Sequence, residues 1–560
     1  MKISRLPIIF WTVLFILSPL YSQPNLGGTG LALTFNIGIW GVAIWFVALS
    51  FLLNRKVLYI PKHWQWFVVF PCFILLSSLW NPTSSPIDLL FTSLFILGGF
   101  TFFIALFQFE FSQSDIEKLL FIVVITVGLH AVIGTAQIWF PDSFISQYFY
   151  SLRDGSPRGV FQQTNVNSTF LATGIIIAIY LISRPGYKTA SLVRKSLLFA
   201  SYFLAIYIVF SSGSRVGLLS LILAIPILLF ARFEHLRQKK REVALLVLLA
   251  ITSFNIGQSG IDKTVDKAAQ LKEQSYSNSR VAMYTIGMEL IEKRPLGYGL
   301  GSFLKVWNKQ ASDFTTRYPE TKLPITINHP HNEFLFWMIE GGLPVLFGLI
   351  CIVIGISIGL YQAGIQSGGA YAAMLLPISL HMQVELPFYI SSLHWFLWLF
   401  LVYLVFRNQV NEISVKVSSA LTKLLRIILV SFTLFGTLFL INTAKAQHDI
   451  YKFVSGLQTG EKPLKTALNN VYTKNYAEQL AMRSMLYHSI ENKEIEKVQY
   501  FLQWALVYVE KSPELKMYED LISASVYLNP AGKGCDMINE ALTMYAHNKP
   551  LQKARDDNCS

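Results

Sequence analysis

Charged residues are scarce in this sequence. They make up 14% of its 560 residues, against about a quarter in a typical soluble protein. Hydrophobic residues account for 53%, and the mean hydropathy is +0.45. Cysteine is also rare, with 4 residues, which excludes a small scaffold built on disulfides. These proportions exclude an ordinary soluble enzyme and predict a protein that lies in a lipid bilayer.

Apolar runs of about 20 residues, long enough to cross a bilayer core of about 30 Å, recur along the chain. The runs at 243–257 and 369–384 are short or polar compared with the others. The first run serves as its own insertion signal, so we expect no cleavable signal peptide. We predict an all-α polytopic membrane protein of about thirteen transmembrane helices, near residues 7–21, 31–53, 64–80, 88–107, 118–139, 167–183, 196–211, 215–231, 243–257, 333–360, 369–384, 390–406 and 424–443.

Basic residues are concentrated in alternate loops. If the N-terminus is cytoplasmic, 19 of the 46 Lys and Arg fall in cytoplasmic segments, whereas the short loops on the other side hold only Arg153, Arg158 and Arg215. Cytoplasmic loops of membrane proteins carry such an excess of Lys and Arg, which fixes the orientation. The net charge of +13 is therefore mainly a topology signal, and we expect no nucleic-acid partner.

This topology predicts four parts. Residues 1–257 form about nine transmembrane helices, 258–332 a large outer loop, 333–443 about four more helices, and 444–560 a soluble domain on the outer side. In the last part, apolar residues recur at helical spacing, and 14 basic residues balance 14 acidic ones. If 369–384 does not cross the bilayer, the tail is cytoplasmic instead.

The four cysteines fall into two groups. Cys535 and Cys559 lie in the tail, which would be in an oxidising compartment. Spacing alone leaves two alternatives open, a disulfide or two free thiols. Cys72 and Cys351 lie within predicted spans, where we expect them to be packing residues.

Four polar clusters lie at the outer ends of predicted spans, where a charge near the bilayer needs a partner or a function. The first runs from Ser156 to Asn167 and leads into a span. Arg158 can donate two hydrogen bonds to a phosphate or carboxylate, and Gln163 and Asn165 add neutral donors and acceptors. The alternative is a polar loop in which Asn167 or the serine after it caps the helix.

The second cluster is Ser212-Gly-Ser-Arg215. Arg215 opens a helix that runs from the outside inward, and a guanidinium beside the free N–H groups of a helix N-terminus forms an anion site. The alternative is an interfacial arginine that reaches the lipid headgroups.

The third cluster begins at Arg280, on an amphipathic stretch, and ends in Pro295-Leu-Gly-Tyr-Gly-Leu-Gly301. The three glycines indicate a tight turn with exposed backbone. No βαβ unit surrounds them, so they do not form a dinucleotide-binding motif. The alternative is a loop helix with a solvated arginine.

The fourth cluster is His329-Pro-His331-Asn332-Glu333, followed by Glu340. A histidine pair suggests a metal, but the i, i+2 spacing before a helix differs from the i, i+4 pair of zinc proteases. A histidine acting as general base fits better. The alternative is a structural histidine that caps the helix.

A smaller group lies at the outer end of a late span, where His381 is followed by Glu385, Pro387 and Tyr389. It either lines the same cleft as the fourth cluster or satisfies the backbone of a broken helix. Arginines at this depth suit a diphosphate whose lipid tail stays in the bilayer, and a histidine suits deprotonation of an incoming hydroxyl. The residues thus favour glycan transfer from a lipid diphosphate.

The motifs around Arg215, Arg280 and His331, with Glu340-Gly-Gly, resemble the O-antigen ligase/polymerase superfamily in their order and topology. The segment Arg158-Gly-x-Phe-x-Gln163-x-Asn165 and the soluble tail resemble bacterial O-linked protein oligosaccharyltransferases of the pilin-glycosylating type. Three positions depart from the usual pattern of these families. They are Thr164 in place of a proline, Leu386 in place of a tyrosine, and Pro344 in place of a glycine.

The resemblance implies an inverting, metal-independent glycosyltransferase without a cofactor. Its donor would be an undecaprenyl diphosphate-linked oligosaccharide, and its acceptors Ser or Thr hydroxyls of periplasmic proteins such as pilin. The enzyme would lie in the bacterial inner membrane and act on the periplasmic side.

By position, His331 matches the essential histidine, Arg215 and Arg280 match the diphosphate-binding arginines, and Gln163 matches a required glutamine. We expect Arg158 to assist with the diphosphate. The remaining supporting residues are Asn165, His329, Asn332, Glu340 and Tyr389.

Other functions remain open. Within the superfamily, a ligase would deliver the glycan to the lipid A core and a polymerase to another lipid-linked repeat. A transporter or flippase would show ionisable residues near the midplane and internal repeats. The sequence shows neither, because the middles of its spans are almost free of charge and its halves do not resemble each other.

Overall fold

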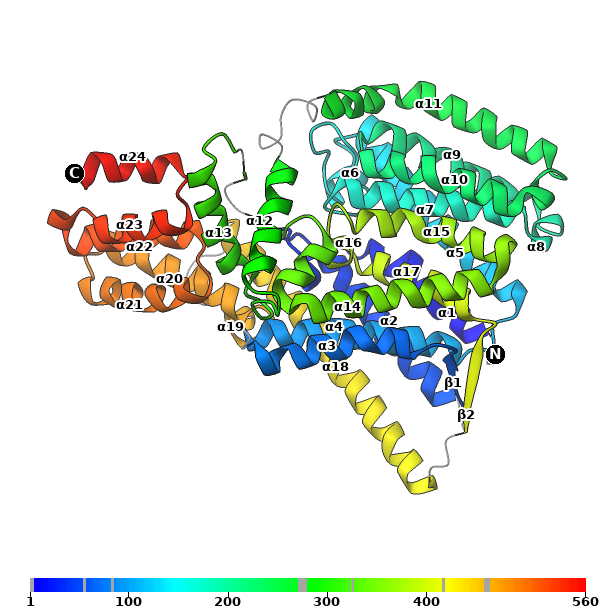
Figure 1. The fold of residues 1–560 in the computed structure, drawn as a ribbon, viewed down its shortest axis with the longest axis horizontal. Helices are drawn as coiled ribbons and strands as arrows, with labels where there is room; N and C mark the ends of the chain where they lie inside the picture. Colours follow the sequence, from blue (N-terminus) through cyan, green and yellow to red (C-terminus); the bar gives the residue numbers. More distant parts are fainter. Residues whose placement is uncertain are drawn as a thin grey trace. The chain divides into compact units, whose positions relative to one another are not determined.

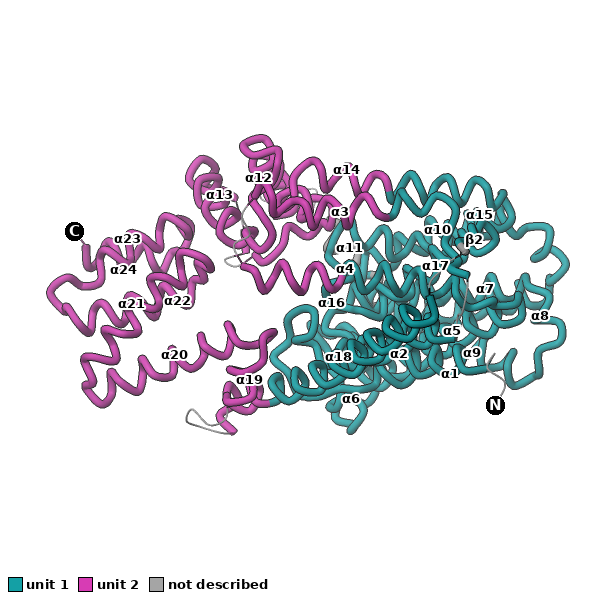
Figure 2. The backbone as a smooth tube through the Cα atoms, turned by 90° about the horizontal axis from the view of Figure 1, so that it is seen from below, with its two compact units in different colours: residues 1–67, 96–269, 352–448 teal, residues 68–95, 270–351, 449–560 magenta. Residues whose placement is uncertain are grey.

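The computed structural model describes residues 5–53, 57–81, 85–269, 279–321, 323–324, 327–414, 418–457 and 464–559. This part of the chain is almost entirely helical (Figure 1), which confirms the predicted all-α membrane fold. The chain divides into two compact units (Figure 2). Unit 1 contains residues 1–67, 96–269 and 352–448, and unit 2 contains 68–95, 270–351 and 449–560.

Unit 1 is a helix bundle with one small sheet. Its elements are α1 (Leu6–Thr12), η2 (Val13–Leu17), η3 (Ser18–Leu20), η4 (Gly30–Ala32), α2 (Thr34–Leu53), β1 (Val57–Pro61), α5 (Gln113–Trp139), α6 (Phe144–Tyr148), α7 (Thr164–Ile182), α8 (Pro185–Lys188), α9 (Leu192–Ser211), α10 (Arg215–Leu236), α11 (Lys240–Ala269), α15 (Gly364–His381), α16 (Pro387–Ile390), α17 (Ser392–Phe406) and β2 (Val410–Ser414). Four further helices have residues in both units: α3 (Gln65–Trp80), α4 (Pro86–Phe107), α14 (Glu333–Gln362) and α18 (Ser419–Val454).

Helix α7 forms the centre of unit 1. It packs against α5, α9, α10 and α15 (Figure 1), and 94% of its apolar window is buried. Small residues permit this close packing: a Cβ on Gly174 would lie 2.3 Å from a methyl carbon of Val127 on α5. The helix that the Gln163 motif opens is therefore the most enclosed span of the bundle.

A helix occupies each of the thirteen predicted spans. Among the described residues, nine helices are long and apolar enough to cross a membrane, namely α2, α4, α5, α7, α9, α10, α11, α14 and α18. Leu6–Leu20, α3 and α17 are shorter apolar helices. The predicted span 369–384 corresponds to α15, which falls outside both sets but packs against α7, α10 and α17. Large apolar side chains such as Phe230 (75% exposed) and Phe435 (71%) face outward, as contact with lipid requires.

The small sheet was not among the elements predicted from the sequence. Strands β1 and β2 pair antiparallel, with Val57 opposite Ser414 and Pro61 opposite Val410. The side chain of Gln108 extends the pairing, because its amide donates to the carbonyl of Tyr59 (2.7 Å) and accepts from the N–H of the same residue (3.2 Å). The sheet therefore joins the segments that follow α2 and α17.

Unit 2 contains α12 (Ser279–Lys293) and α13 (Phe303–Arg317), together with the helices of the C-terminal domain. Those helices are α19 (Lys465–Asn469), α20 (Lys474–Glu491), α21 (Ile495–Lys511), α22 (Leu515–Leu528), η7 (Pro530–Gly532), α23 (Cys535–Met544) and α24 (Lys549–Asn558).

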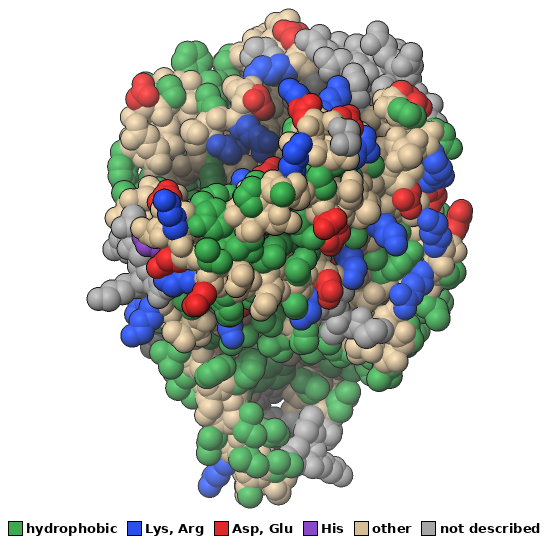
Figure 3. Space-filling view, turned by 90° about the vertical axis from the view of Figure 1, so that its left-hand side faces the viewer, with side chains coloured by type: hydrophobic (Ala, Val, Ile, Leu, Met, Phe, Trp, Pro, Cys, Tyr) green, Lys and Arg blue, Asp and Glu red, His purple; other side chains and the backbone are tan. Residues whose placement is uncertain are grey.

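The helices of the C-terminal domain pack around their own apolar core, which includes Phe501, Tyr518 and Leu521. A disulfide joins Cys535 to Cys559, so the structure favours the paired alternative for these cysteines. Acidic and basic side chains mix on the face shown in Figure 3. No single charge sign dominates that surface, in agreement with the balanced charge of the tail.

Helix α13 is fixed to the C-terminal domain by buried polar contacts. The amide of Asn308 donates to the carbonyl of Pro513 (3.2 Å) and to the hydroxyl of Tyr545 (2.8 Å). The hydroxyl of Ser312 accepts from the N–H of Ala546 (3.2 Å). The loop helix and the tail are therefore parts of one packed unit.

Candidate functional site

The candidate residues are divided between the two units. Arg280, His329, His331, Asn332 and Glu340 belong to unit 2. Unit 1 contains the other candidates, which are Arg158, Gln163, Asn165, Arg215 and Tyr389.

In unit 2, the glycine-rich turn after α12 is bonded to a kink in α14. Pro344 has no N–H, so the carbonyl of Glu340 lacks its usual helical partner. The N–H of Gly299 bonds that carbonyl instead (2.9 Å). In the same way, the N–H of Leu343 donates to the carbonyl of Pro295 (2.8 Å), and the carbonyl of Ile339 accepts from Tyr298 (3.0 Å). The proline at position 344 thus has a structural role in joining the turn to α14.

Two glycines make this approach possible. Gly297 (φ +84°) and Gly342 (φ +75°) both have the left-handed backbone that favours glycine. A Cβ on Gly297 would lie 2.5 Å from the carbonyl oxygen of Glu340, and one on Gly342 would lie 2.3 Å from the carbonyl carbon of Leu296. The two glycine motifs of the sequence are therefore the two sides of one backbone contact.

The side chain of Glu340 is buried and caps a helix. Its Oε1 accepts from the N–H of Gly301 (3.0 Å) and of Phe303 (3.2 Å), at the start of α13. A carboxylate at a helix N-terminus satisfies N–H groups that lack helical partners and is favoured by the helix dipole. This geometry makes Glu340 a positioning residue for the loop that separates α12 from α14.

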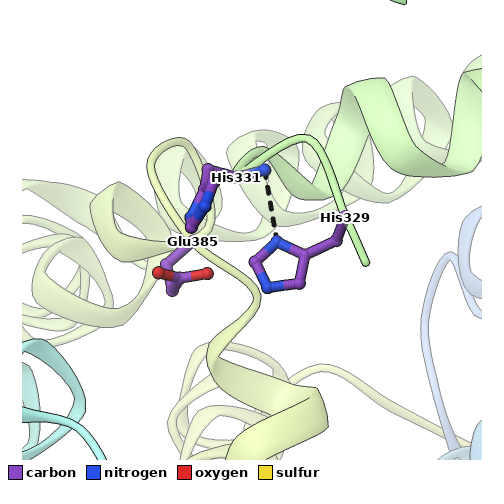
Figure 4. A group of neighbouring side chains, drawn as sticks. All are labelled: His329, His331 and Glu385. Atoms are coloured by element: carbon purple, nitrogen blue, oxygen red, sulfur yellow. Dashed lines mark hydrogen bonds between the residues drawn. The ribbon is translucent and has the colours of Figure 1, made fainter. Parts of the chain in front are cut away.

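His331 lies directly before α14 in a strained conformation. Its φ is +51°, which is uncommon for a residue with a side chain and is found at functional sites. Its N–H donates to Nδ1 of His329 (3.2 Å), and the two rings lie 4.5 Å apart (Figure 4). Because Nδ1 of His329 accepts, that imidazole carries its proton on Nε2 when neutral.

Asn332, rather than a histidine, caps α14. Its Oδ1 accepts from the N–H of Leu335 (2.9 Å). The N–H of Leu335 is therefore capped by Asn332, a residue next to the histidine that the sequence offered as the alternative cap. Both imidazoles remain half-buried, with their rings outside the capping contact.

The two imidazoles offer a metal ion two of the three or four protein ligands that zinc takes. Glu385, drawn with them in Figure 4, lies on unit 1 in the segment before α16 and is buried.

Arg280 is the second residue of α12 and is half-buried. A partly buried network of polar side chains joins this helix to α13. Gln310 donates to Glu289 and accepts from Lys293 (2.6 Å), and Arg317 pairs with Glu289 at 2.5 Å. The hydrogen bond and charge of Glu289 raise the pKa of Arg317. Arg280 thus lies on a helix that polar side-chain contacts join to α13.

In unit 1, the structure brings the Gln163 motif and Arg215 together. Arg215 is the first residue of α10, and the hydroxyl of Ser214 caps that helix by accepting from Gly217 (3.2 Å). The same hydroxyl donates to Oδ1 of Asn165 on α7 (2.9 Å). Ser168 and Ser212 form a second bond between these helix ends, at 2.9 Å.

Gln163 precedes α7 as its N-cap residue, without a side-chain capping bond. Asn167 and Ser168 lie inside the helix, so neither caps it, contrary to the alternative drawn from the sequence. Gly217 permits the close approach of α10, because a Cβ there would lie 2.7 Å from that of Ser168.

Arg158 is held by its own loop. Its Nε donates to the carbonyl of Ser151 (2.7 Å) and its Nη1 to that of Gln162 (3.3 Å), while the guanidinium lies over the ring of Tyr150 at 5.3 Å. Burial and the neighbouring Arg153 lower its pKa.

One residue that organises the loop around Arg158 was not predicted from the sequence. Gln137, fully buried on α5, donates to the carbonyls of Tyr150 (2.6 Å) and Gly159 (2.8 Å). Its Oε1 accepts from the N–H groups of Arg158 and Gly159, both at 2.9 Å. The only signal in the sequence is a single amide near the outer end of an apolar span.

Tyr389 lies on the short helix α16 and is half-buried. His381, at the end of α15, shares a 2.8 Å hydrogen bond between its Nδ1 and the hydroxyl of Thr169 on α7. The late-span group therefore borders the same central helix that the Gln163 motif opens.

Two parts of the chain match known families. Residues 200–350 match the family described as O-antigen ligase. The chain belongs to the O-antigen ligase superfamily. Residues 370–557 match the family described as virulence factor membrane-bound polymerase, C-terminal. No curated protein sequence matches the chain.

The ligase match contains Arg215, Arg280, His331 and Glu340, and the polymerase match runs from α15 through the C-terminal domain. Membership of the superfamily supports glycan transfer by a multi-pass membrane enzyme. It also implies a lipid-linked glycan donor and a glycan acceptor.

Proposed function

We propose that this chain transfers a preassembled glycan from undecaprenyl diphosphate to Ser or Thr hydroxyls of periplasmic proteins such as pilin. The bond between Asn165 and Ser214 carries the proposal. It links the motif that resembles protein oligosaccharyltransferases to the turn that presents Arg215, a residue of the ligase motifs. One helix-end cluster thus combines both sequence resemblances.

In the proposed reaction, His331 takes up the proton of the Ser or Thr hydroxyl. The oxygen of that hydroxyl attacks the anomeric carbon of the glycan at the same time. The bond from that carbon to the diphosphate breaks with inversion, and undecaprenyl diphosphate leaves with the electron pair. Arg215 and Arg280 stabilise the charge that develops on the diphosphate, assisted by Arg158. Glu340 and Asn332 position the segments that bear Arg280 and His331.

The disulfide supports a periplasmic location for the C-terminal domain. Disulfides persist in oxidising compartments such as the periplasm and are rare in the cytosol. The pair Cys535–Cys559 therefore favours the orientation inferred from the basic loops, in which the inner membrane anchors the protein and the tail faces the periplasm.

A polymerase is the second candidate function. The match over residues 370–557 supports it, because the description of that family names a membrane-bound polymerase. A polymerase would use the same diphosphate chemistry but deliver the glycan to a second lipid-linked repeat. A ligase, which delivers to the lipid A core, differs again only in the acceptor.

The test compares cells that carry the intact gene, a deletion, His331→Ala or His488→Ala. His488 is exposed on α20 and serves as the matched control for loss of an imidazole. Intact-mass analysis of pilin and other periplasmic proteins detects protein-bound glycan, and the lipopolysaccharide ladder from the same cells reports the other acceptors.

We expect the deletion and His331→Ala to abolish protein glycosylation at unchanged protein level, with a normal ladder and with His488→Ala active. A lost or shortened ladder with unchanged proteins would assign the chain to the ligases or polymerases. Glycosylation retained in His331→Ala would refute the role of His331. Transfer by the purified enzyme should also survive EDTA, since the mechanism uses no metal.

A further inference from the structure

A cluster of basic residues lies at the opposite end of unit 1 from the cluster around Asn165 and Ser214. It is built where α7, α8 and α10 end and where α9 and α11 begin. Arg184 and Arg232 lie over the ring of Tyr180, at 5.5 and 5.6 Å from its centre. Lys195 and Lys239 lie over another ring, that of Tyr187, each at 5.1 Å. Arg194 lies 4.6 Å from the ring of Phe121.

Two of these cations, Arg194 and Lys195, line a narrow cleft. Its walls also include Phe121 and Tyr187. Arg232 is 2% exposed and donates to the hydroxyl (2.9 Å) and the carbonyl (3.2 Å) of Ser183. The cluster is therefore an organised site with a buried guanidinium, in contrast to a solvated loop.

Positive charge exceeds negative charge in this cluster. Among the described residues, Glu117 forms an ion pair with Arg184 (3.3 Å) and Glu242 forms one with Lys239 (4.0 Å). Glu117 also accepts a hydrogen bond from the N–H of Gly186, at 3.1 Å. The five cations thus face two carboxylates within ion-pair distance. In the described part of the chain, Arg194, Lys195 and Arg232 have no carboxylate within ion-pair distance, which favours the binding of an additional anion.

The surface beside the cluster is aliphatic. On the first turns of α9, Leu192 (80% exposed), Val193 (69%) and Leu197 (46%) face outward. At about 100° per residue, they cover the arc next to the one that bears Arg194 and Lys195. A single helix therefore presents acyl-chain contacts and phosphate contacts side by side. Free inorganic phosphate would contact only the basic side chains and not the aliphatic ones.

From this juxtaposition we propose that the cluster binds the headgroup of an anionic phospholipid in the cytoplasmic leaflet. The phosphate lies between Arg194, Lys195 and Lys239, and the acyl chains run along the exposed leucines and valine of α9. Basic pockets between transmembrane helices on the cytoplasmic side bind such headgroups. This site is distinct from the one proposed for glycan transfer, and only its assignment to the cytoplasmic leaflet rests on the orientation given with the proposed function.

The test uses the full chain, purified in a neutral detergent. Tetraoleoyl cardiolipin, dioleoyl phosphatidylglycerol, dioleoyl phosphatidylethanolamine and inorganic phosphate are added separately. The thermal unfolding midpoint is measured, and native mass spectrometry counts the retained lipid molecules. The variant K195Q/K239Q removes the two ammonium groups over Tyr187. The control R237Q/K240Q removes two exposed charges at the same end.

We expect both anionic lipids to raise the midpoint and to be retained, unlike phosphatidylethanolamine or inorganic phosphate. Binding to K195Q/K239Q should weaken roughly 25-fold, because each Lys near a headgroup contributes about a factor of five. R237Q/K240Q should bind as the wild type does. Equal effects of anionic and zwitterionic lipids on the wild type would overturn the proposal, and so would equal losses in the two variants. Stabilisation by inorganic phosphate alone would show a free-anion site instead.

Discussion

The side chain of Gln137 and the backbone of Gly159 are joined by two reciprocal hydrogen bonds. Nε2 donates to the carbonyl of Gly159 at 2.8 Å, and the N–H of Gly159 donates back to Oε1 at 2.9 Å. The same amide also donates to the carbonyl of Tyr150 and accepts from the N–H of Arg158. One buried side chain therefore makes four hydrogen bonds to one loop. The position of the Arg158 loop therefore depends on a residue of α5.

Gln137→Leu should destabilise the protein and impair glycan transfer. The substitution leaves two N–H and two C=O groups without their partner, and each unmet buried polar group costs about 1–3 kcal/mol. We expect a loss of about 3 kcal/mol or more, measured by thermal unfolding in detergent. The control is Thr135→Val on the same helix, where the hydroxyl donates to the carbonyl of Ala131, its one partner among the described residues. Equal thermal unfolding midpoints for Gln137→Leu and Thr135→Val would contradict the role of Gln137 in holding the Arg158 loop.

Replacement of Glu340 should separate hydrogen bonding from charge. In Glu340→Gln an oxygen can still accept from Gly301 and Phe303, whereas Glu340→Ala removes the acceptor. A lost helix cap costs about 1 kcal/mol, so hydrogen exchange in the first turn of α13 should be about fivefold faster in the alanine variant. Mass spectrometry of peptides from the full chain measures this rate. If the glutamine variant exchanged as fast as the alanine variant, the charge itself would be required.

The fold could be predicted from the sequence because one property dominates it. An apolar run of about 20 residues has few alternatives to a helix in a bilayer, so all thirteen predicted positions are helical. The paired strands β1 and β2 were missed, since each is five residues long and its partner lies about 350 positions away. The disulfide was left open for a similar reason, because spacing does not reveal distance.

The motifs of the candidate site could be found in the sequence, but the contacts between them could not. The contact between the turn at Gly297 and the kink at Gly342 is made by main-chain groups, which every sequence possesses. Pro344 looked like a departure from a family pattern, yet it frees the carbonyl that Gly299 bonds. Gln137 was overlooked because a lone amide in a span carries no periodicity.

Loss of the disulfide should loosen the C-terminal domain. Closing a loop with a sequence separation of 24 residues stabilises a fold by about 3 kcal/mol in the chain-entropy account. We expect Cys535→Ser to increase proteolysis of α23 and α24 in membranes, and Cys72→Ser to leave it unchanged. Before reduction, alkylation of the unfolded wild-type chain should label Cys72 and Cys351 only. Labelling of all four cysteines would contradict the bond.

His547 should make the C-terminal domain sensitive to acid. Burial lowers the pKa of its imidazole below 6.5, and neither ring nitrogen has a hydrogen-bond partner in the described part of the chain. The folded domain therefore keeps this group neutral, while the unfolded chain takes up a proton near pH 6.5. The free energy of unfolding should be constant above that pH and decrease as the pH falls below it.

The substitution His547→Phe, which replaces the imidazole with an apolar ring, tests whether His547 causes this pH dependence of the free energy of unfolding. Hydrogen exchange of peptides from α21 and α22 in the full chain, corrected for the intrinsic pH dependence of exchange, should accelerate between pH 7 and pH 5 in the wild type. In His547→Phe this acceleration should be smaller, because the residue no longer binds a proton on unfolding. The exposed control His488→Phe should keep the wild-type slope. A wild-type slope in His547→Phe would mean that other groups carry the acid sensitivity of the domain.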